Sequence, residues 1–172
     1  GIDITGNVVS TVGCTYSVGD LVPALGGYIF YLDGSGCHGL VAKATDEPGS
    51  IQWSTTNFAT YAFASGIYGG AQNTKKSIAQ AVSNVSTCPA ATQASLTAGG
   101  FNDWYLPSKD ELDMMYVNLH MQGLGGFANG DYWSSTENDN NSAWLQYFYN
   151  GLQYYFLNVK TSTGRVRAVR AF

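Results

Sequence analysis

AWLQYFYNGLQYYFLNV, residues 143–159, is the stretch that decides the architecture of this chain. Two runs of strand-forming residues flank Asn150–Gly151, and Asn-Gly between such runs is the strongest short-range signal for a hairpin. Seven of the thirteen residues from Trp144 to Phe156 are aromatic, and residues 140–159 contain no Asp, Glu, Lys or Arg. We therefore predict an uncharged, aromatic β-hairpin here.

The tyrosines of this hairpin indicate a binding surface. A strand buried on both faces reads as a continuous run of Val, Ile and Leu, whereas Asn and Tyr fill nine of the 21 positions from 138 to 158. Tyr gives a large contact area at low entropic cost and Asn gives adaptable hydrogen bonds, which is the composition of a paratope. We expect the tyrosines to face solvent and the four tryptophans, Trp53, Trp104, Trp133 and Trp144, to lie in the core.

Periodicity and end signals predict the other elements. Ser108 and Glu111 form a capping box that starts a helix over 108–121. The remaining predicted elements are a hairpin over 28–43, helices over 73–84 and 89–98, and strands from 132 and from 165 to the end.

Composition sets the class of protein. The chain has 172 residues, of which only 12% are charged, with 21 Gly and 12 Tyr; this is typical of exported β-rich domains. The net charge of -4 disfavours a nucleic-acid partner, and the sequence has no apolar run of about eighteen residues for membrane insertion. We expect residues 1–18 to be a lead-in strand or linker and residues 19–172 to form one extracellular, ligand-binding domain.

The three cysteines match no zinc pattern. In an exported protein we favour a Cys37–Cys88 disulfide with Cys14 unpaired, and the alternative is three buried, reduced thiols.

Two groups of acidic and amide side chains could in principle supply oxygen ligands to a metal ion. Asp110, Glu111 and Asp113 complement the dipole at a helix N-terminus, and the run from Glu137 to Asn141 lacks the spacing of a calcium loop. We expect neither to bind a metal, and we expect no cofactor.

Several motifs, in order, resemble the Lcl C-terminal domain family, which is named for a collagen-like bacterial adhesin. They are GGYIFYLDGSGCHGLVA (26–42), DWYLPSKDEL (103–112), YWSSTE (132–137) and RVRAVRAF (165–172), and the resemblance covers about residues 18–172.

This resemblance implies an α+β domain with the C-type lectin-like fold: two main helices around a twisted, mostly antiparallel sheet with long irregular loops. It also implies an exported module of a bacterial surface. The named adhesin binds sulfated glycans, and the acidic charge of this chain departs from that ligand class. Formylglycine-generating relatives need a pair of cysteines in the C-terminal part, and this chain has none after Cys88, so we expect no enzyme activity.

The C-terminal part is also similar to the variable proteins of diversity-generating retroelements, in which adenine-directed mutagenesis rewrites Asn-type codons. That resemblance implies a fixed scaffold at Ala143, Trp144, Gln146, Phe148, Gly151, Gln153 and Lys160. The candidate variable, ligand-binding positions are Asn138, Asn140, Asn141, Leu145, Tyr147, Tyr149, Leu152, Tyr154, Tyr155, Phe156 and Asn158.

The sequence therefore favours a non-catalytic adhesin or receptor-binding module whose partner is a protein or glycan on another cell or surface. The alternative is a structural subunit of a surface appendage or virion that uses the aromatic face for assembly.

Overall fold

The computed structural model describes residues 13–155 and 159–172. Within these residues, nine strands form three small antiparallel sheets, accompanied by three α-helices. The strands are β1 (Leu21–Val22), β2 (Gly27–Leu32), β3 (Gly39–Lys43), β4 (Ile51–Gln52), β5 (Asp131–Glu137), β6 (Ala143–Tyr147), β7 (Gln153–Tyr154), β8 (Thr163–Gly164) and β9 (Val169–Ala171). The helices are α1 (Gly69–Ser83), α2 (Pro89–Ala94) and α3 (Lys109–Asn118), with single 3-10 turns at Pro23–Leu25 and His120–Gln122.

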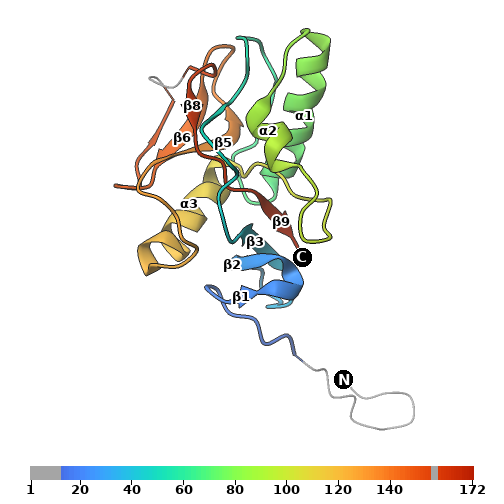
Figure 1. The fold of residues 1–172 in the computed structure, drawn as a ribbon. Helices are drawn as coiled ribbons and strands as arrows, with labels where there is room; N and C mark the ends of the chain where they lie inside the picture. The colour runs from blue at the N-terminus through green and yellow to red at the C-terminus, as the bar shows by residue number, and fades with distance from the viewer. Residues whose placement is uncertain (1–12, 156–158) are drawn as a thin grey trace, which may run out of the picture.

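The first sheet has the order β1-β2-β3-β9. It confirms the hairpin predicted over residues 28–43, and the C-terminal strand β9 pairs with β3. Gly27 and Gly39 stand where a Cβ would collide with the backbone of the neighbouring strand. This sheet lies at one end of the molecule and the β5-β6-β7 sheet at the other, with α3 in contact with both (Figure 1).

The capping box predicted at Ser108 is present. The Ser108 hydroxyl accepts a hydrogen bond from the Glu111 backbone N–H, and the Glu111 carboxylate accepts one from the Ser108 N–H at 2.7 Å. Helix α3 ends at Asn118, earlier than predicted, because the chain tightens into a 3-10 turn that Gly123 closes with φ of 71°. No helix among the described residues is both long and apolar enough to cross a membrane.

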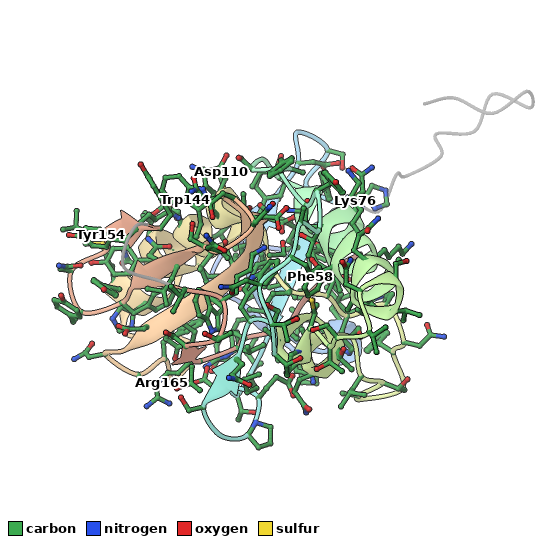
Figure 2. All side chains as sticks on the ribbon, turned by 90° about the horizontal axis from the view of Figure 1, so that it is seen from above. Phe58, Lys76, Asp110, Trp144, Tyr154 and Arg165 are labelled. Carbon is green, nitrogen blue, oxygen red and sulfur yellow. A yellow bond between two sulfur atoms is a disulfide. The ribbon has the colours of Figure 1, made fainter. Side chains whose placement is uncertain are left out.

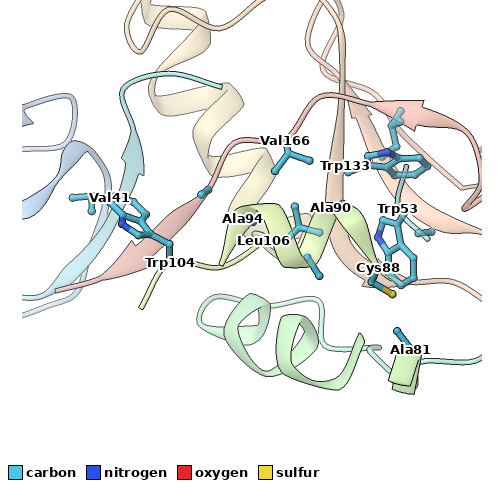
Figure 3. Close-up of a cluster of buried hydrophobic side chains, with 14 of the residues drawn as sticks. Val41, Trp53, Ala81, Cys88, Ala90, Ala94, Trp104, Leu106, Trp133 and Val166 are labelled. Carbon is cyan, nitrogen blue, oxygen red and sulfur yellow. The ribbon is translucent and has the colours of Figure 1, made fainter. Parts of the chain in front are cut away.

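Two adjoining hydrophobic clusters form the core. One contains Trp53, Trp104 and Trp133 together with the alanines of α2 (Figure 3). The other joins the first sheet to α3, to Tyr132 of β5 and to Phe148, which directly follows β6. Three of the four tryptophans are thus core residues, as predicted, and Trp144 is the half-buried exception.

The prediction of a C-type lectin-like fold is wrong. The family resemblance implies two main helices around one twisted sheet, but the strands divide among three separate sheets, and only α1 exceeds ten residues. The two-residue strands β4 and β8 pair with each other although they lie far apart in the sequence. Such a pairing leaves no local periodic signal in the sequence, so the division into separate sheets could not be predicted. The molecule is mainly β-sheet with few helices.

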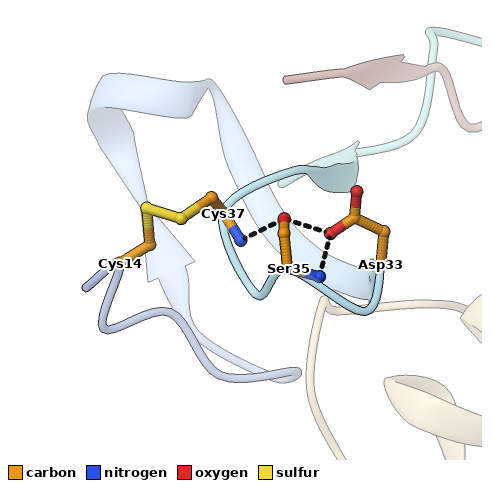
Figure 4. The surroundings of a disulfide bond; sticks show 4 residues. All are labelled: Cys14, Asp33, Ser35 and Cys37. Carbon is orange, nitrogen blue, oxygen red and sulfur yellow. Dashed lines mark hydrogen bonds between the residues drawn. A yellow bond between two sulfur atoms is a disulfide. The ribbon is translucent and has the colours of Figure 1, made fainter. Parts of the chain in front are cut away.

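The predicted Cys37–Cys88 disulfide is also wrong, because Cys37 is bonded to Cys14. Cys37 lies in the turn between β2 and β3, where the Ser35 hydroxyl accepts a hydrogen bond from the Cys37 N–H and donates one to Asp33 (Figure 4). Cys88 is a buried, free thiol in the first core cluster, so it is remote from that exposed turn.

A candidate binding surface on the ribbon of residues 143–155

The predicted aromatic hairpin exists as β6, residues 148–152 and β7, which together with Tyr155 we call the ribbon. β6 pairs on one side with β5, through Trp133 opposite Leu145, and on the other with β7, through Leu145 opposite Tyr154. Because side chains alternate along each strand, the ribbon presents two faces. One carries Leu145, Tyr147 and Tyr154, and the other carries Trp144, Gln146, Gln153 and Tyr155.

Two glutamines fix the ribbon to α3. The Gln146 side-chain amide is buried and donates to Asp113 Oδ1 at 2.6 Å and to the Gly151 carbonyl at 3.0 Å. The Gln153 amide donates to the Lys109 carbonyl at 2.6 Å. Gln supplies both donors and acceptors from one side chain, and these contacts set the position of the ribbon on the helix.

The connection between β6 and β7 is longer than the two-residue turn that Asn150–Gly151 predicts. The Tyr147 N–H donates to the Leu152 carbonyl, so residues 148–152 close the loop. Phe148 turns into the core and contacts Tyr132, with ring centroids 4.3 Å apart. Gly151 adopts a φ of 77° against Tyr116, where no Cβ would fit. The loop is therefore held at its base and displays its tip.

Three tyrosine rings gather on one face of the ribbon. Tyr147 stacks on Tyr149 with centroids 5.4 Å apart and contacts Tyr154 at 4.8 Å. Burial, and secondarily the charge of Asp131 opposite it in β5, raise the pKa of Tyr147. Tyr149 is 60% exposed. This cluster offers adjoining phenol rings to solvent.

The other face carries an aromatic pair. The Trp144 and Tyr155 rings lie 4.8 Å apart, and the Lys109 ammonium lies 5.1 Å from the centre of the Trp144 ring. Tyr155 is 38% exposed. In Figure 2, Trp144, Asp110 and Tyr154 lie along the same edge of the molecule. The two faces of the ribbon thus both contribute aromatic surface.

The Asn-rich loop at residues 138–142 continues this surface. Asp139 Oδ1 accepts hydrogen bonds from the backbone N–H groups of Asn141 and Ser142, both at 2.8 Å, and these bonds lower the pKa of Asp139. Asn140 and Asn141 are exposed and Asn138 is half-buried. The Asp139 carboxylate closes the loop on itself, and the Asn138 amide also bonds within it, to Asp139 and Ser142. Asn140 and Asn141 are thus the exposed amides on a fixed backbone.

A buried ion pair supports the base of that loop. The ammonium of Lys160 contacts the Glu137 carboxylate, and both side chains are fully buried. Lys160 also donates to the Phe58 carbonyl at 2.7 Å and lies over the Trp53 ring. Burial lowers the pKa of Lys160, and its bond to Glu137 opposes that effect. A buried charge needs such partners, so Lys160 is structural.

The predicted site residues divide into three groups. Asn140, Asn141, Tyr149, Leu152 and Tyr155 are exposed, and Asn138, Tyr147 and Tyr154 are partly exposed. Leu145 is only 3% exposed and packs in the first core cluster. Its side chain cannot form part of the surface, because the face it occupies is covered near Trp133. Phe156 and Asn158 lie outside the described residues.

The structure exposes a second group of aromatics that the sequence did not predict. Tyr61, Phe63 and Tyr68 lie in the segment between β4 and α1, and all three are exposed. Their signal was the aromatic content of this segment, but five aromatics among Gly, Ser and Thr carry no periodicity that separates exposed from buried positions.

The described residues contain no cluster of three or more His, Cys, Asp or Glu able to hold a metal ion. Burial raises the pKa of the Cys88 thiol to about 12, which leaves it protonated and unreactive at neutral pH.

The model of the family described as the Lcl C-terminal domain matches residues 42–170, well over half of the chain. A solved fimbrial protein from Bacteroides ovatus is similar in structure, with a TM-score of 0.58 and 15% sequence identity over 95% of this chain and 40% of the fimbrial chain. At that identity the likeness concerns the fold, and this fimbrial-type fold replaces the C-type lectin-like assignment. No curated protein matches the sequence.

Proposed function

The chain belongs to the Lcl C-terminal domain family, and from this premise we propose that it is a non-catalytic binding module of a bacterial or phage surface protein. It acts outside the cell, and its partner is bound by the ribbon and the adjoining loop at residues 138–142. Binding rests on the area of tyrosine rings and on hydrogen bonds from asparagine amides.

The observation that supports this proposal is that the ribbon contains both buried side chains, which fix its backbone, and large exposed side chains between them. Ala143, Gln146 and Phe148 are buried and fix the backbone, whereas Tyr149 and Leu152 are 60% and 51% exposed. Because hydrophobic stabilisation scales with the apolar area removed from water, Tyr149 and Leu152 contribute little of it to this fold. Contiguous exposed aromatics of this kind mark interaction sites.

We also propose that the displayed positions vary in the manner of a diversity-generating retroelement. The codon-based scaffold positions Ala143, Gln146, Phe148 and Lys160 are buried, and Gly151 has no room for a side chain. Among the candidate variable positions that the structure describes, all but Leu145 are exposed or partly exposed. Sequencing the surrounding DNA for a near-copy of this segment tests the idea: mismatches confined to adenines of the copy support it, and mismatches spread over all four bases refute it.

The second candidate function is that of a structural subunit whose aromatic surface contacts a neighbouring copy. The observation that favours it is the similarity in fold to a fimbrial protein. Sedimentation of the purified chain separates the two functions. A monomer supports the binding module, and a stable oligomer that protects Tyr149 and Tyr155 from chemical modification supports the subunit.

The binding module is tested with an array of extracellular proteins and glycans probed with the purified chain. We expect Tyr149→Ala and Tyr155→Ala to weaken binding by about tenfold or more while the midpoint of thermal unfolding stays within about 3 °C of the parent. Leu21→Ala is the matched control, because Leu21 is exposed on β1 at the other end of the molecule. Equal binding by all three variants would contradict the proposal, and so would an array on which the parent protein binds nothing.

A further inference from the structure

We propose that Tyr61 and Phe63 form a second part of the binding surface, and that the partner is a protein with an uncharged, apolar contact area. This inference rests on the proposed function and extends it to a segment about eighty residues earlier in the sequence. The two rings lie edge to face with centroids 6.4 Å apart, and they are 57% and 53% exposed.

The backbone that carries these rings is fixed by Glu137. The N–H groups of Thr60 and Tyr61 donate to the two Glu137 carboxylate oxygens at 2.8 and 2.7 Å, and the Glu137 N–H donates to the Ala62 carbonyl at 2.9 Å. The Lys76 ammonium donates to the Tyr61 carbonyl at 3.1 Å. Charge-assisted hydrogen bonds to a buried carboxylate are among the stronger hydrogen bonds in proteins. They hold the backbone of this segment in a defined position.

Tyr61 is held in a conformation that its residue type disfavours. Its φ is 58°, which lies in the left-handed region where glycine is favoured and other residues are strained. Glycine would make the same backbone hydrogen bonds without that strain. A ring that is more than half exposed gains little free energy from burial to offset the backbone strain. The Tyr61 ring therefore contributes little to the stability of the folded chain.

Backbone strain at an exposed residue does not by itself identify a binding residue, because Val85 has a φ of 50° and is also exposed. Val85 follows the last turn of α1, is 97% exposed and carries no ring. Tyr61 differs because its ring contacts another exposed ring. Val85 therefore serves as the control residue, because its backbone is strained but it presents no aromatic ring to a partner.

The segment that carries the two rings is bonded to the elements that carry the proposed surface. Glu137, which binds the Tyr61 backbone, directly precedes the loop at residues 138–142. Farther along the same segment, the Ser65 carbonyl accepts a hydrogen bond from the Asp110 N–H at 3.1 Å, and neighbouring Lys109 covers the Trp144 ring. Two chains of contacts thus connect Tyr61 and Phe63 to the ribbon.

The chemistry of this combined surface indicates a protein partner. Phe63, Leu152 and Val159 are exposed side chains without a polar atom, and residues 140–159 carry no charged side chain. Centres of protein interfaces are depleted in charge and enriched in Tyr, Trp and Phe. A sulfated glycan would require a cluster of exposed basic residues. The lysines beside this surface are already paired, because Lys76 donates to the Tyr61 carbonyl and Lys109 pairs with Asp110 beside the Trp144 ring.

The test uses the full chain and, as its probe, the immobilised extracellular protein that gives the strongest signal on the array. We expect Tyr61→Gly to keep the midpoint of thermal unfolding within about 3 °C of the parent, because glycine retains the backbone bonds and relieves the strain. We expect the same variant, and Phe63→Ala separately, to raise the dissociation constant by about tenfold. Val85→Gly should leave the dissociation constant unchanged.

Comparison with Tyr149→Ala separates this inference from the proposed function. If Tyr149→Ala weakens binding and neither Tyr61→Gly nor Phe63→Ala does, the inference is wrong and the proposed function stands. If Tyr61→Gly and Phe63→Ala weaken binding and Tyr149→Ala does not, the inference stands and the ribbon is not the binding site. An array that retains the chain only on glycans overturns the assignment of a protein partner.

Discussion

Glu111 shows how one residue connects the sequence signal of a helix cap to the stability of the fold. Its carboxylate is fully buried, where it accepts hydrogen bonds from the Ser108 N–H at 2.7 Å and from the Tyr105 hydroxyl at 3.2 Å. Burial raises the pKa of Glu111 from its ordinary value of 4.5 to about 7, and the two hydrogen bonds oppose that shift. The native state therefore binds the Glu111 proton more tightly than the unfolded chain does.

This pKa predicts a pH dependence of stability. The contribution of Glu111 is fully present below about pH 4.5 and is lost as the pH rises through about 7, which amounts to about 3 kcal/mol at most. Glu111→Gln keeps a carbonyl oxygen for the Ser108 N–H and cannot ionise. Urea unfolding between pH 4.5 and 8 should show the parent losing stability relative to this variant. Parallel pH profiles for the two proteins would refute the prediction.

At the scale of elements, the ribbon depends on the glycine at the base of its loop. Gly151→Ala places a methyl group against the Tyr116 ring and also strains a φ of 77°. We expect it to lower the free energy of unfolding by about 2–4 kcal/mol, of which about 1 kcal/mol is backbone strain. Gly123→Ala isolates that strain, because φ there is 71° and nothing lies within 4 Å of the added methyl group.

Urea unfolding measures both glycine variants, and hydrogen exchange locates the effect. Protection should decrease in β6 and β7 of Gly151→Ala while β2 and β3 stay protected. Addition of Tyr116→Ala to Gly151→Ala should restore part of the stability by removing the collision. Equal destabilisation by Gly151→Ala and Gly123→Ala would show that Tyr116 plays no part.

The elements that the sequence predicted correctly are those with local signals. The capping box at Ser108 starts α3, and the Asp33–Gly34 turn connects the strands of the hairpin at 28–43. Helix α1 begins at Gly69, four residues before the predicted start at Asn73. Two glycines disfavour a helix start by propensity, but Gly70 packs where a side chain would strike Glu111 and Leu106. Tertiary packing overrides propensity at that position.

At the scale of the whole molecule, the failures of prediction come from pairings between distant residues. The C-type lectin-like fold was inferred from resemblance, but the pairing of β4 with β8 and of β3 with β9 divides the strands into separate sheets. The exposure of the candidate site was largely predictable, because Asn and Tyr replace Val, Ile and Leu there. Leu145 and the loop carrying Tyr61 were not predictable, since their exposure depends on which distant segment covers them.

The Cys14–Cys37 disulfide acts on the whole molecule, because it closes a loop with a sequence separation of 23 residues around β1 and β2. Loop closure restricts the unfolded chain, and a loop of this length contributes about 3 kcal/mol. Cys14→Ser with Cys37→Ser should lower the free energy of unfolding by about that amount. The ribbon lies at the other end of the molecule (Figure 1), so the dissociation constant measured with the array protein should not change below the unfolding transition. A parallel loss of binding in the folded variant would mean that the two ends are coupled, and the exposed aromatics would then depend on the order of the first sheet.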